Sequence, residues 1–275
     1  MDKCVLRKVQ LLELEILDEI DRICSKNKLN YFLIAGSLIG AIRHKGFIPW
    51  DDDLDIAMPR EDYEKFIEIC KRELNNRFFL DASEVSYKYY RLAAKIRINN
   101  TLYIQKDLKS YKGHQGIWVD ILPLDETNNK KKLKIQAYIK SLLEVAIEYK
   151  CKVDISEKSL WKRFISILVS IFPLKFLKIF QQKVMTLDNK KNYNYFVNLA
   201  SKYSFKKQTF QKKDWMPAKK YFFENKKYNI PNNYDKILRS VYGNYMEIPS
   251  KDKQEIHNPI KIKFEDGEEH NYEKI

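Results

Sequence analysis

The most informative part of the sequence is residues 31–66, which read YFLIAGSLIGAIRHKGFIPWDDDLDIAMPREDYEKF. Apolar runs and turn residues along it predict a buried strand, a short helix, a second strand and an amphipathic helix, in that order. These elements are expected over residues 31–35, 38–44, 48–58 and 62–74. Pro59 and the acidic residues that follow it are typical of the first turn of a helix.

The segments on either side extend this pattern. Apolar residues recur every three or four positions from Val5 to Ile23, which predicts an amphipathic helix. Further strands are expected over residues 78–82, 91–98, 101–105 and 116–124. The pattern then turns helical from Asn128 to about Asp188, with a break at Pro173. An aromatic hairpin or loop and a closing helix are expected over residues 215–230 and 235–246.

This order of elements predicts an α+β (α/β) fold, in which a mixed sheet is flanked by helices and a C-terminal helical layer is added. We expect residues 1–125 to form the catalytic core. Residues 126–275 are expected to be mainly helical and basic, to pack on the core and to complete the site. The absence of repeats and of Gly/Ser-rich linkers favours one body over two independent domains.

Charge is distributed unevenly along the 275 residues, whose net charge is +14. Residues 1–125 carry 20 basic and 20 acidic side chains, and residues 126–275 carry 31 and 17. A protein that coats nucleic acid would more often be basic throughout, so we expect no nucleic-acid partner. The basic second part indicates docking on a polyanion, although a coding bias toward lysine explains much of the excess equally well.

Cysteines and apolar stretches exclude several other classes. The four cysteines are far apart and form no CxxC pair, so neither a zinc site nor a disulfide framework is indicated. The first ten residues lack an apolar signal region, and the longest apolar stretch, 164–174, is too short to span a bilayer. The sequence therefore predicts a cytoplasmic protein. Residues 161–180 combine a broad apolar face with Lys and Arg, which favours a core helix with a basic edge over a membrane-surface helix.

The residues that carry the chemistry follow Trp50. If residues 48–58 form a strand, Asp51, Asp53 and Asp55 lie on one face. Carboxylates so close together repel one another and resist ionisation, and a divalent cation removes that conflict. Oxygen-only ligands suit Mg²⁺ or Mn²⁺. A solvated acidic turn is the alternative interpretation, which the alternation of Leu54, Ile56 and Met58 and the preceding Gly-Ser pair argue against.

Gly36 and Ser37 end one strand and open a helix. Such a helix start offers backbone N–H groups and a hydroxyl to an anion. The signal is weak alone, but it is strengthened by the acidic strand a dozen or so residues later. Together the two features predict a phosphate-binding turn and metal ligands on neighbouring strands.

Residues 35–66 resemble the signature of the LicD family of phosphocholine transferases, which is similar to the fukutin-related ribitol-phosphate transferases. The resemblance extends to GIWVDILPLD (116–125) and to the block 222–257, but not to residues 130–210. It implies a nucleotidyltransferase-like fold with a mixed sheet. It also implies that Gly36 and Ser37 contact phosphate.

The resemblance further implies that Asp53 and Asp55 bind the metal and that Asp120 is the third catalytic carboxylate. The first metal aspartate of the superfamily usually stands nearer the Gly-Ser pair, so Asp51 is also a candidate ligand. Alternation in residues 117–121 places Asp120 and Trp118 on one strand face, in agreement with this assignment.

Other substrate-binding candidates lie between and beyond these motifs. Three of these candidates are cationic: Arg43, His44 and Lys45. We expect them to neutralise donor phosphates or, alternatively, to form a surface cluster at a helix end. Aromatic faces could bind a quaternary ammonium group, although most aromatic residues are expected in the core; the candidates are Trp50, Trp118, Tyr87, Tyr89 and Tyr90. The block 222–257 contributes residues for which we expect a structural or acceptor-positioning role, namely Glu224, Tyr242, Gly243 and His257. Of these, Gly243 is expected to cap a helix, and His257 as a base is the less favoured interpretation.

The function implied by these features is a metal-dependent transfer of phosphocholine, or a related substituted phosphate, from a CDP-linked donor such as CDP-choline. The acceptor would be a sugar hydroxyl of a cell-surface glycan, such as lipopolysaccharide or teichoic acid, or of its lipid-linked precursor. Peripheral contact with the inner face of the membrane would follow. One alternative is a nucleotidyltransferase that acts on a small molecule or RNA. The other is a non-catalytic basic protein that binds nucleic acid, which would not explain the aspartates.

Overall fold

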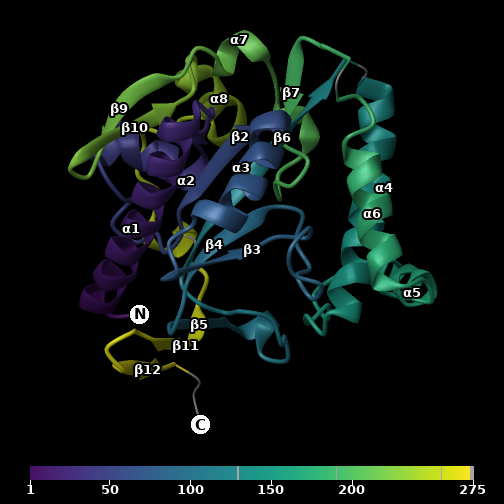
Figure 1. The fold of residues 1–275 in the computed structure, drawn as a ribbon, viewed down its shortest axis with the longest axis horizontal. Helices are drawn as coiled ribbons and strands as arrows, with labels where there is room; N and C mark the ends of the chain where they lie inside the picture. Colours follow the sequence, from purple (N-terminus) through teal and green to yellow (C-terminus); the bar gives the residue numbers. More distant parts are fainter. Residues whose placement is uncertain (129, 190, 255, 273–275) are drawn as a thin grey trace.

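A mixed sheet of seven strands runs through the centre of the molecule (Figure 1). The computed structural model describes residues 1–128, 130–189, 191–254 and 256–272. Five strands lie side by side in the order β1 (Phe32–Leu33), β2 (Asp55–Pro59), β6 (Trp118–Thr127), β4 (Ala94–Ile98) and β3 (Phe78–Asp81). The far end of β6 also pairs with β7 (Tyr195–Val197), which pairs with β8 (Thr209–Gln211). Only β2 and β6 are parallel among the described pairs of this sheet.

Two helices cover one face of this sheet. α1 (Lys3–Asn27) and α3 (Arg60–Glu73) pack against each other and against the central strands. Ile56 of β2, Val119 of β6 and Ile96 of β4 are completely buried in the core on this side. Because successive side chains of a strand point to opposite faces, the residues between these apolar ones lie on the other face.

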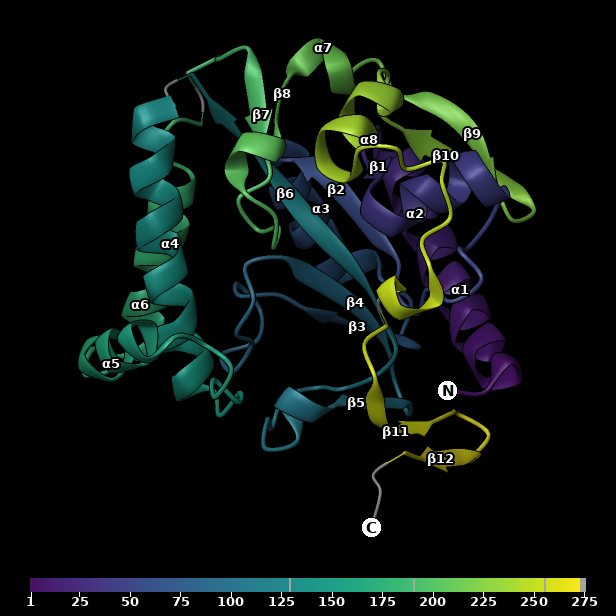
Figure 2. The same ribbon diagram turned by 180° about the vertical axis from the view of Figure 1, so that it is seen from behind.

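A second apolar cluster lies on that other face. It joins residues of β1, β2 and β6 to residues of β7, β8, α7 (Lys212–Trp215) and α8 (Tyr234–Tyr242). Figure 2 shows α8 and α2 (Ala35–Ile39) on this side of the molecule. α2 continues into a π-helical turn, Gly40–His44, and packs on β2 and α8.

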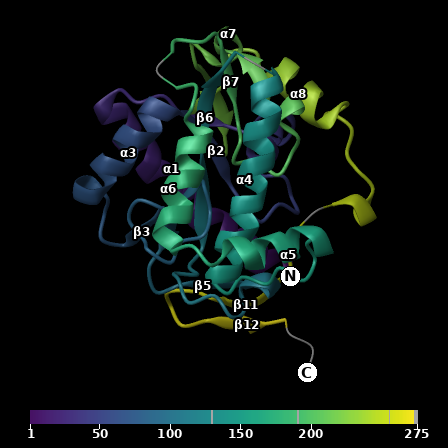
Figure 3. The same ribbon diagram turned by 90° about the vertical axis from the view of Figure 1, so that its right-hand side faces the viewer.

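Three helices form a layer beside the sheet (Figure 3). They are α4 (Lys130–Lys150), α5 (Leu160–Val169) and α6 (Leu174–Met185). α4 packs on both of the others, and Leu143 and Leu177 meet Tyr90 of the core in a third apolar cluster. α5 and α6 meet at a bend of 117°. Within the described residues no single helix is long and apolar enough to cross a membrane, although this bent pair has the length and composition.

The remaining strands form two small sheets. One is the hairpin β9 (Lys219–Phe223) and β10 (Lys226–Ile230). The other places β5 (Leu102–Gln105) beside β11 (Pro259–Lys263) and β12 (Glu269–Asn271). Three short 3₁₀ helices complete the described elements, at Lys106–Leu108, Phe205–Lys207 and Lys251–Lys253.

The predicted fold class is confirmed, because helices flank a mixed sheet. The helical pattern up to about Asp188 and its break at Pro173 are also confirmed, and Pro173 immediately precedes α6. The aromatic segment 215–230 forms the hairpin β9–β10 after the short helix α7. Gly243 ends α8 with a positive φ of 68°, as expected of a helix cap.

Some boundaries differ from the prediction: the closing helix expected over 235–246 ends at Tyr242, and two others lie nearer the site. The strand expected over 48–58 begins only at Asp55, because a turn from Ile48 to Asp51 precedes it and residues 51–54 belong to no strand. The boundary placed at residue 125 falls inside β6, and residues 126–275 contain the strands β7 to β12 as well as helices. β7 and β8 extend the same sheet that holds the predicted site.

Candidate active site

Four charged residues stand in one row across four neighbouring strands. The strand registers pair Asp55 with Asp120, Asp120 with Lys95, and Lys95 with Asp81. Paired residues point to the same face of a sheet, here the face opposite α1 and α3. Neighbouring strands are about 5 Å apart, so Asp55 and Asp120 bring two carboxylates close together. The row joins two residues predicted from the sequence to Lys95, which was not predicted.

The segment before β2 carries the other two predicted carboxylates. Asp51 and Asp53 are partly exposed, whereas Asp52 and Leu54 are buried. The side chains of residues 51–55 therefore alternate as they would in a strand, although β2 has not yet begun. The prediction that Asp51, Asp53 and Asp55 share one side is confirmed by this alternation.

Neighbouring residues hold this segment in place. Gln10 of α1 donates from Nε2 to the carbonyl oxygen of Asp51 (2.9 Å). Gly36 lies so close that a Cβ atom there would be 2.3 Å from Oδ2 of Asp51. Ser37 is buried, and its Oγ accepts a hydrogen bond from the backbone N–H of Asp55 (2.8 Å). Gly36 and Ser37 thus pack against the acidic segment, and their contact with phosphate stays a prediction.

Asp120 is held through one of its two oxygens. Nζ of Lys95 and Nε1 of Trp118 each donate to Oδ2 over 2.8 Å. The other oxygen, Oδ1, is buried and has no hydrogen-bond partner among the described residues. A buried carboxylate oxygen without a partner is costly unless an ion or ligand completes it. Asp120 therefore offers Oδ1 for a further contact.

Burial and charge act differently along the row. Burial, followed by the negative charges of Asp53 and Asp120, raises the pKa of Asp55 well above its usual range. Burial also acts to raise the pKa of Asp120, but the positive charges of Lys95 and Arg91 oppose it and the net pKa is lowered. Lys95 itself is so deeply buried that its pKa falls to about 7. Negative charge thus dominates the row, which favours a bound cation.

The excess of negative charge extends beyond the row. Burial and the charges of Asp53 and Asp55 raise the pKa of Asp51 well above its usual range. Glu13 of α1 is buried, and both of its oxygens lack a partner within the described part of the chain. Burial first, and then the neighbouring aspartates, raise the pKa of Glu13 well above its usual range. Such a cluster needs protons or a cation to neutralise it.

Asp52 faces the other way and links the acidic segment to the C-terminal part of the chain. It accepts hydrogen bonds from the hydroxyl of Tyr103 and from the backbone N–H of His257. Nδ1 of His257 lies 3.0 Å from Oδ1 of Asp52, and Nε2 lies 3.6 Å from Oδ2 of Asp53. Burial alone would lower the pKa of His257, but the contacts with Asp52 and Asp53 raise it. His257 therefore belongs to the site.

The predicted metal can be compared with these groups. Among the described residues, no three His, Cys, Asp or Glu side chains are gathered into a ready-made metal site. The donor chemistry nevertheless fits a hard cation, because the groups concerned are carboxylates. The unpartnered Oδ1 of Asp120 and the raised pKa of Asp55 both indicate missing positive charge. Metal binding stays a prediction.

The predicted cations of the π-helical turn contact the C-terminal region. Arg43 donates to the carbonyl oxygens of Tyr245 (2.5 Å) and Glu247 (3.0 Å). Lys45 donates to the hydroxyl of Tyr221 over 2.7 Å. These contacts tie the turn to the chain beyond it, and a role toward donor phosphates stays a prediction for both residues.

Glu224, for which a structural or acceptor-positioning role is expected, contacts two other parts of the chain. Its Oε1 accepts from the backbone N–H of Phe47 (3.1 Å), and its Oε2 accepts from Arg7 (2.7 Å). A Cβ atom on Gly46 would lie 2.4 Å from Oε1, so the chain passes very close to this carboxylate. Glu224 thus clamps the turn that leads into the acidic segment.

The two tryptophans predicted to face a quaternary ammonium group have different surroundings. Trp50 is partly exposed, and its ring meets that of His44 edge-on with 6.2 Å between centroids. Trp118 is only 3% exposed, and Nζ of Lys95 lies 4.1 Å from its ring centroid. Two cations of the protein, Lys95 and Arg97, therefore already lie near the ring of Trp118. An ammonium contact stays a prediction for both rings.

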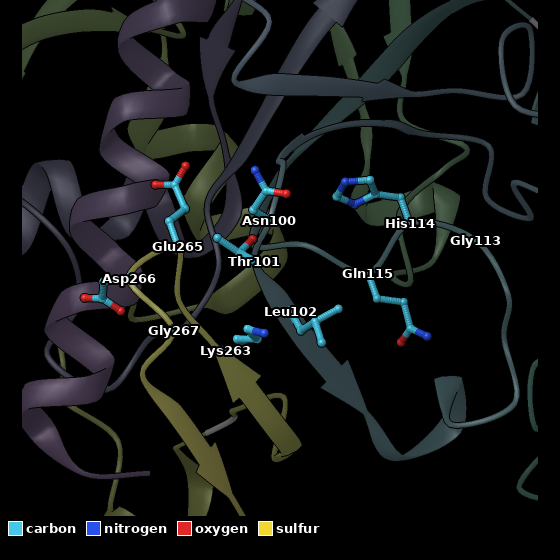
Figure 4. A pocket seen from close by; sticks show the side chains of 10 residues that line it. All are labelled: Asn100, Thr101, Leu102, Gly113, His114, Gln115, Lys263, Glu265, Asp266 and Gly267. Carbon is cyan, nitrogen blue, oxygen red and sulfur yellow. The ribbon is translucent and has the colours of Figure 1, made fainter.

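A cavity of about 600 Å³ lies elsewhere, between β5 and the C-terminal hairpin. Figure 4 shows His114 and Gln115 on one side of it and Glu265 and Asp266 on the other. None of the predicted site residues lines this cavity. The row of charges and this cavity are therefore separate features.

Comparison with known proteins then identifies the domain that carries the row. The sequence profile described as LicD/FKTN/FKRP, nucleotidyltransferase domain, matches residues 28–150. The chain carries a LicD-family domain. The matched range holds β1 to β6 and the whole row, whereas His257 lies outside it. The resemblance to the LicD family drawn from residues 35–66 and 116–125 is confirmed.

Individual relatives extend the LicD-family similarity beyond this domain. The chain is 29% identical over 269 residues to the lipopolysaccharide cholinephosphotransferase LicD of Haemophilus influenzae, which covers 94% of this chain and 97% of that protein. It is 26% identical over 120 residues to an uncharacterized protein of Rickettsia prowazekii, covering 36% of this chain and 45% of that one. An uncharacterized protein of Rickettsia typhi is 40% identical over 55 residues, which cover 20% of this chain and 18% of that protein.

Sequence reasoning missed two residues of this candidate site and underestimated a third. Lys95 had a usable signal, because charged residues alternate with apolar ones in the strand 91–98. Asp52 stands between two aspartates of the opposite face, so its burial beside Tyr103 follows from the same alternation. His257 was expected mainly as a structural residue, yet it contacts Asp52 and approaches Asp53.

Proposed function

We propose that this protein transfers phosphocholine, or a related substituted phosphate, from a CDP-linked donor to a sugar hydroxyl of lipopolysaccharide or another cell-surface glycan such as teichoic acid. The similarity to a relative named as a lipopolysaccharide cholinephosphotransferase, along 94% of the chain, supports this activity. The observation that carries the proposal is the pairing of Asp55 with Asp120 on one sheet face, with Oδ1 of Asp120 unpartnered among the described residues.

Asp53, Asp55 and Asp120 are the residues that would hold a divalent cation, with Asp51 as a further candidate. Their carboxylate oxygens suit Mg²⁺ or Mn²⁺. Such an ion, when bound, would neutralise charge on the donor phosphates and on the leaving nucleotide. The raised pKa values of Asp51, Asp53 and Asp55 support this assignment, because burial and mutual repulsion oppose their ionisation without it.

The proposed reaction breaks the phosphoanhydride bond of the donor and forms a phosphodiester bond to the acceptor. The oxygen of the acceptor hydroxyl forms a bond to the phosphorus that bears choline. The bond from that phosphorus to the oxygen bridging the two phosphates breaks, and CMP leaves with the electron pair. The hydroxyl proton passes to a carboxylate of the site.

The two roles open to Asp120, ligand or proton acceptor, can be weighed on its surroundings. Lys95 and Trp118 hold Oδ2, and the net pKa of Asp120 is lowered. A carboxylate with a lowered pKa is a weak base, which favours the role of ligand. We therefore assign Asp120 the role of ligand.

A location follows from the donor. Nucleotide-linked donors are intracellular metabolites, so we propose that the protein works in the cytoplasm. An acceptor that is a lipid-linked glycan would then be met at the inner face of the membrane.

The experiment that tests this function measures CMP release from a panel of CDP-linked donors carrying choline, ethanolamine or ribitol. Lipopolysaccharide is the acceptor, and each reaction is run with Mg²⁺ or with EDTA. Asp120→Asn removes one proposed ligand, and Asp107→Asn is the matched control because Asp107 is exposed and lies outside the row. We expect a loss of about 100-fold or more for Asp120→Asn and none for the control.

Two results would contradict the proposal. One is the absence of CMP release from every CDP-linked donor. The other is equal turnover by the wild type and Asp120→Asn, which would remove the row from the reaction. Choline appearing on the acceptor without release of CMP would point instead to a different donor.

A further inference from the structure

α5 and α6 expose an unusual number of large apolar side chains. Ten of them are 43% to 82% exposed, and together they define the α5–α6 apolar surface: Leu160, Trp161, Phe164, Ile167, Leu168, Ile171, Phe172, Phe176, Ile179 and Phe180. They fall within 21 consecutive positions. The sequence favours a core helix here, and the exposed side chains show that this interpretation is wrong. Apolar surface gathered in this way marks a site of interaction.

The inner side of α6 is packed normally, and α5 turns Ser166 and Val169 toward the protein. Leu174 and Leu177 of α6 are buried against Leu143 and Ile147 of α4. Lys178 points inward and donates to the carbonyl oxygen of Tyr87 (2.8 Å). The exposed residues are therefore not a displaced core. They form the outward side of a helix pair that is already docked on the protein.

The charge within the stretch of sequence that carries this surface has one sign. No Asp or Glu occurs from residue 158 to residue 187, whereas six basic residues do: Lys158, Lys162, Arg163, Lys175, Lys178 and Lys183. Lys175 and Lys183 are exposed, and Arg163 is partly exposed. Large apolar side chains interspersed with cations are typical of helices that lie in the headgroup region of an anionic membrane.

The geometry favours lying on a membrane over crossing it. α5 has 10 residues and α6 has 12, and a helix needs about 20 to span the hydrocarbon core. The bend of 117° between them also prevents a continuous span. Figure 3 shows α5 across the lower ends of α4 and α6, at the outside of the molecule. Two short helices in this arrangement can rest on a surface together.

We propose that the α5–α6 apolar surface is a membrane-docking surface that binds bilayers rich in anionic lipid. A second copy of this chain is a poorer occupant, because pairing the surface with itself would bring the exposed lysines of both copies together. An anionic bilayer accepts both the apolar side chains and the cations. The inference stands apart from the proposed reaction, although it would bring the enzyme to a lipid-linked acceptor.

The test is flotation of the full-length protein with two kinds of vesicle. One contains phosphatidylcholine alone, and the other contains about 30% phosphatidylglycerol as the anionic lipid. Ile171→Ser with Phe176→Ser removes exposed apolar contacts. Lys175→Gln with Lys183→Gln removes exposed charge. The control pair is Phe222→Ser with Ile248→Ser, which are similarly exposed but lie outside the surface.

We expect the wild type and the control pair to float with the anionic vesicles. The apolar double variant should bind roughly tenfold more weakly or worse, and the lysine double variant several-fold more weakly, with its remaining binding less sensitive to salt. The fluorescence of Trp161 should shift to the blue on binding, and Trp161→Phe should lose that component. Asp120→Asn should bind as the wild type does, which separates this inference from the proposed reaction.

Three results would overturn the inference. The wild type could fail to float with either vesicle. The control pair could lose as much binding as the apolar double variant. Light scattering could show a dimer that the apolar double variant converts to a monomer, which would make the surface a contact between two copies.

Discussion

Asp55 and Asp120 face each other across the parallel strands β2 and β6, and the backbone N–H of Asp120 donates to the carbonyl oxygen of Leu54 (2.9 Å). The separation of the two carboxylates is therefore set by backbone pairing. Two unit charges about 5 Å apart repel by about 3 kcal/mol at an effective dielectric constant of about 20. This cost is several times the thermal energy of about 0.6 kcal/mol, so the pair calls for a counter-charge.

Asp55→Asn should stabilise the metal-free protein while abolishing activity. A carboxyl whose pKa is raised on folding is destabilising when ionised, because the unfolded state ionises more easily at neutral pH. Removing the charge should raise the free energy of unfolding by about 1–2 kcal/mol. Urea unfolding in EDTA at pH 7.5 measures this. A variant less stable than the wild type would show that Asp55 is not held against repulsion.

Lys95→Met should lower both stability and activity. The side chains of Lys95 and Asp120 are 4% and 13% exposed, and removing one partner of a buried ion pair typically costs about 3 kcal/mol. Transfer should fall by about tenfold or more, because Oδ2 of Asp120 loses a donor that orients it. Adding Asp120→Asn to Lys95→Met should restore part of the stability and none of the activity. Recovery of both together would assign Lys95 a purely structural role.

The ion pair of Arg60 with Asp125 should matter for folding and not for chemistry. Nε and Nη2 of Arg60 lie 2.8 and 2.9 Å from the two oxygens of Asp125, and both side chains are almost completely buried. Arg60→Met should cost about 4 kcal/mol in the free energy of unfolding, since it leaves a buried carboxylate unpaired. The double variant Arg60→Met/Asp125→Leu should recover at least half of that. Urea unfolding measures both, and turnover per folded molecule should stay unchanged.

His114 should make the protein less stable in mild acid. Burial and the charge of Arg97 lower the pKa of His114 to about 4, below its ordinary value of about 6.5. Nδ1 accepts the backbone N–H of Gly116 (3.0 Å), a bond that protonation would break. The unfolded state therefore binds the proton more readily, and stability should fall as the pH drops from 6.5 toward 4.

Because the ring of His114 is partly exposed, we expect the loss in the free energy of unfolding to be only about 2 kcal/mol. Unfolding in urea at pH 7 and pH 4.5 measures it against His114→Gln, whose side chain does not titrate. The wild type should lose more stability than the variant between the two pH values. Equal losses would mean that other groups account for the whole acid sensitivity.

Alternation in the acidic segment was readable from the sequence, because an extended chain alternates its side chains whether or not it pairs. Where the strand begins was not readable. β1 has only two residues, which pair with Ile56 and Ala57, so it cannot extend the ladder back to residue 51. The start of β2 therefore depends on the length of a distant partner, which local sequence does not report.

The role of Lys95 depends on register in the same way. A shift of one residue between β4 and β6 would send Lys95 to the opposite face of the sheet. The strands β11 and β12 depend on a long-range pairing with β5, and short alternating segments carry little signal of it. The apolar surface of α5 and α6 was visible as composition, but whether it faces a core or solvent is decided by the helices around it.

The central claim, that the carboxylates on β2 and β6 together bind a divalent cation, is tested most directly by titrating the protein with Mn²⁺ and following free Mn²⁺ by electron paramagnetic resonance. Wild type and Asp107→Asn should each bind the ion, and the donor nucleotide should tighten that binding. Asp55→Asn and Asp120→Asn should each weaken it by about tenfold or more. Equal Mn²⁺ binding by all four proteins would contradict the account.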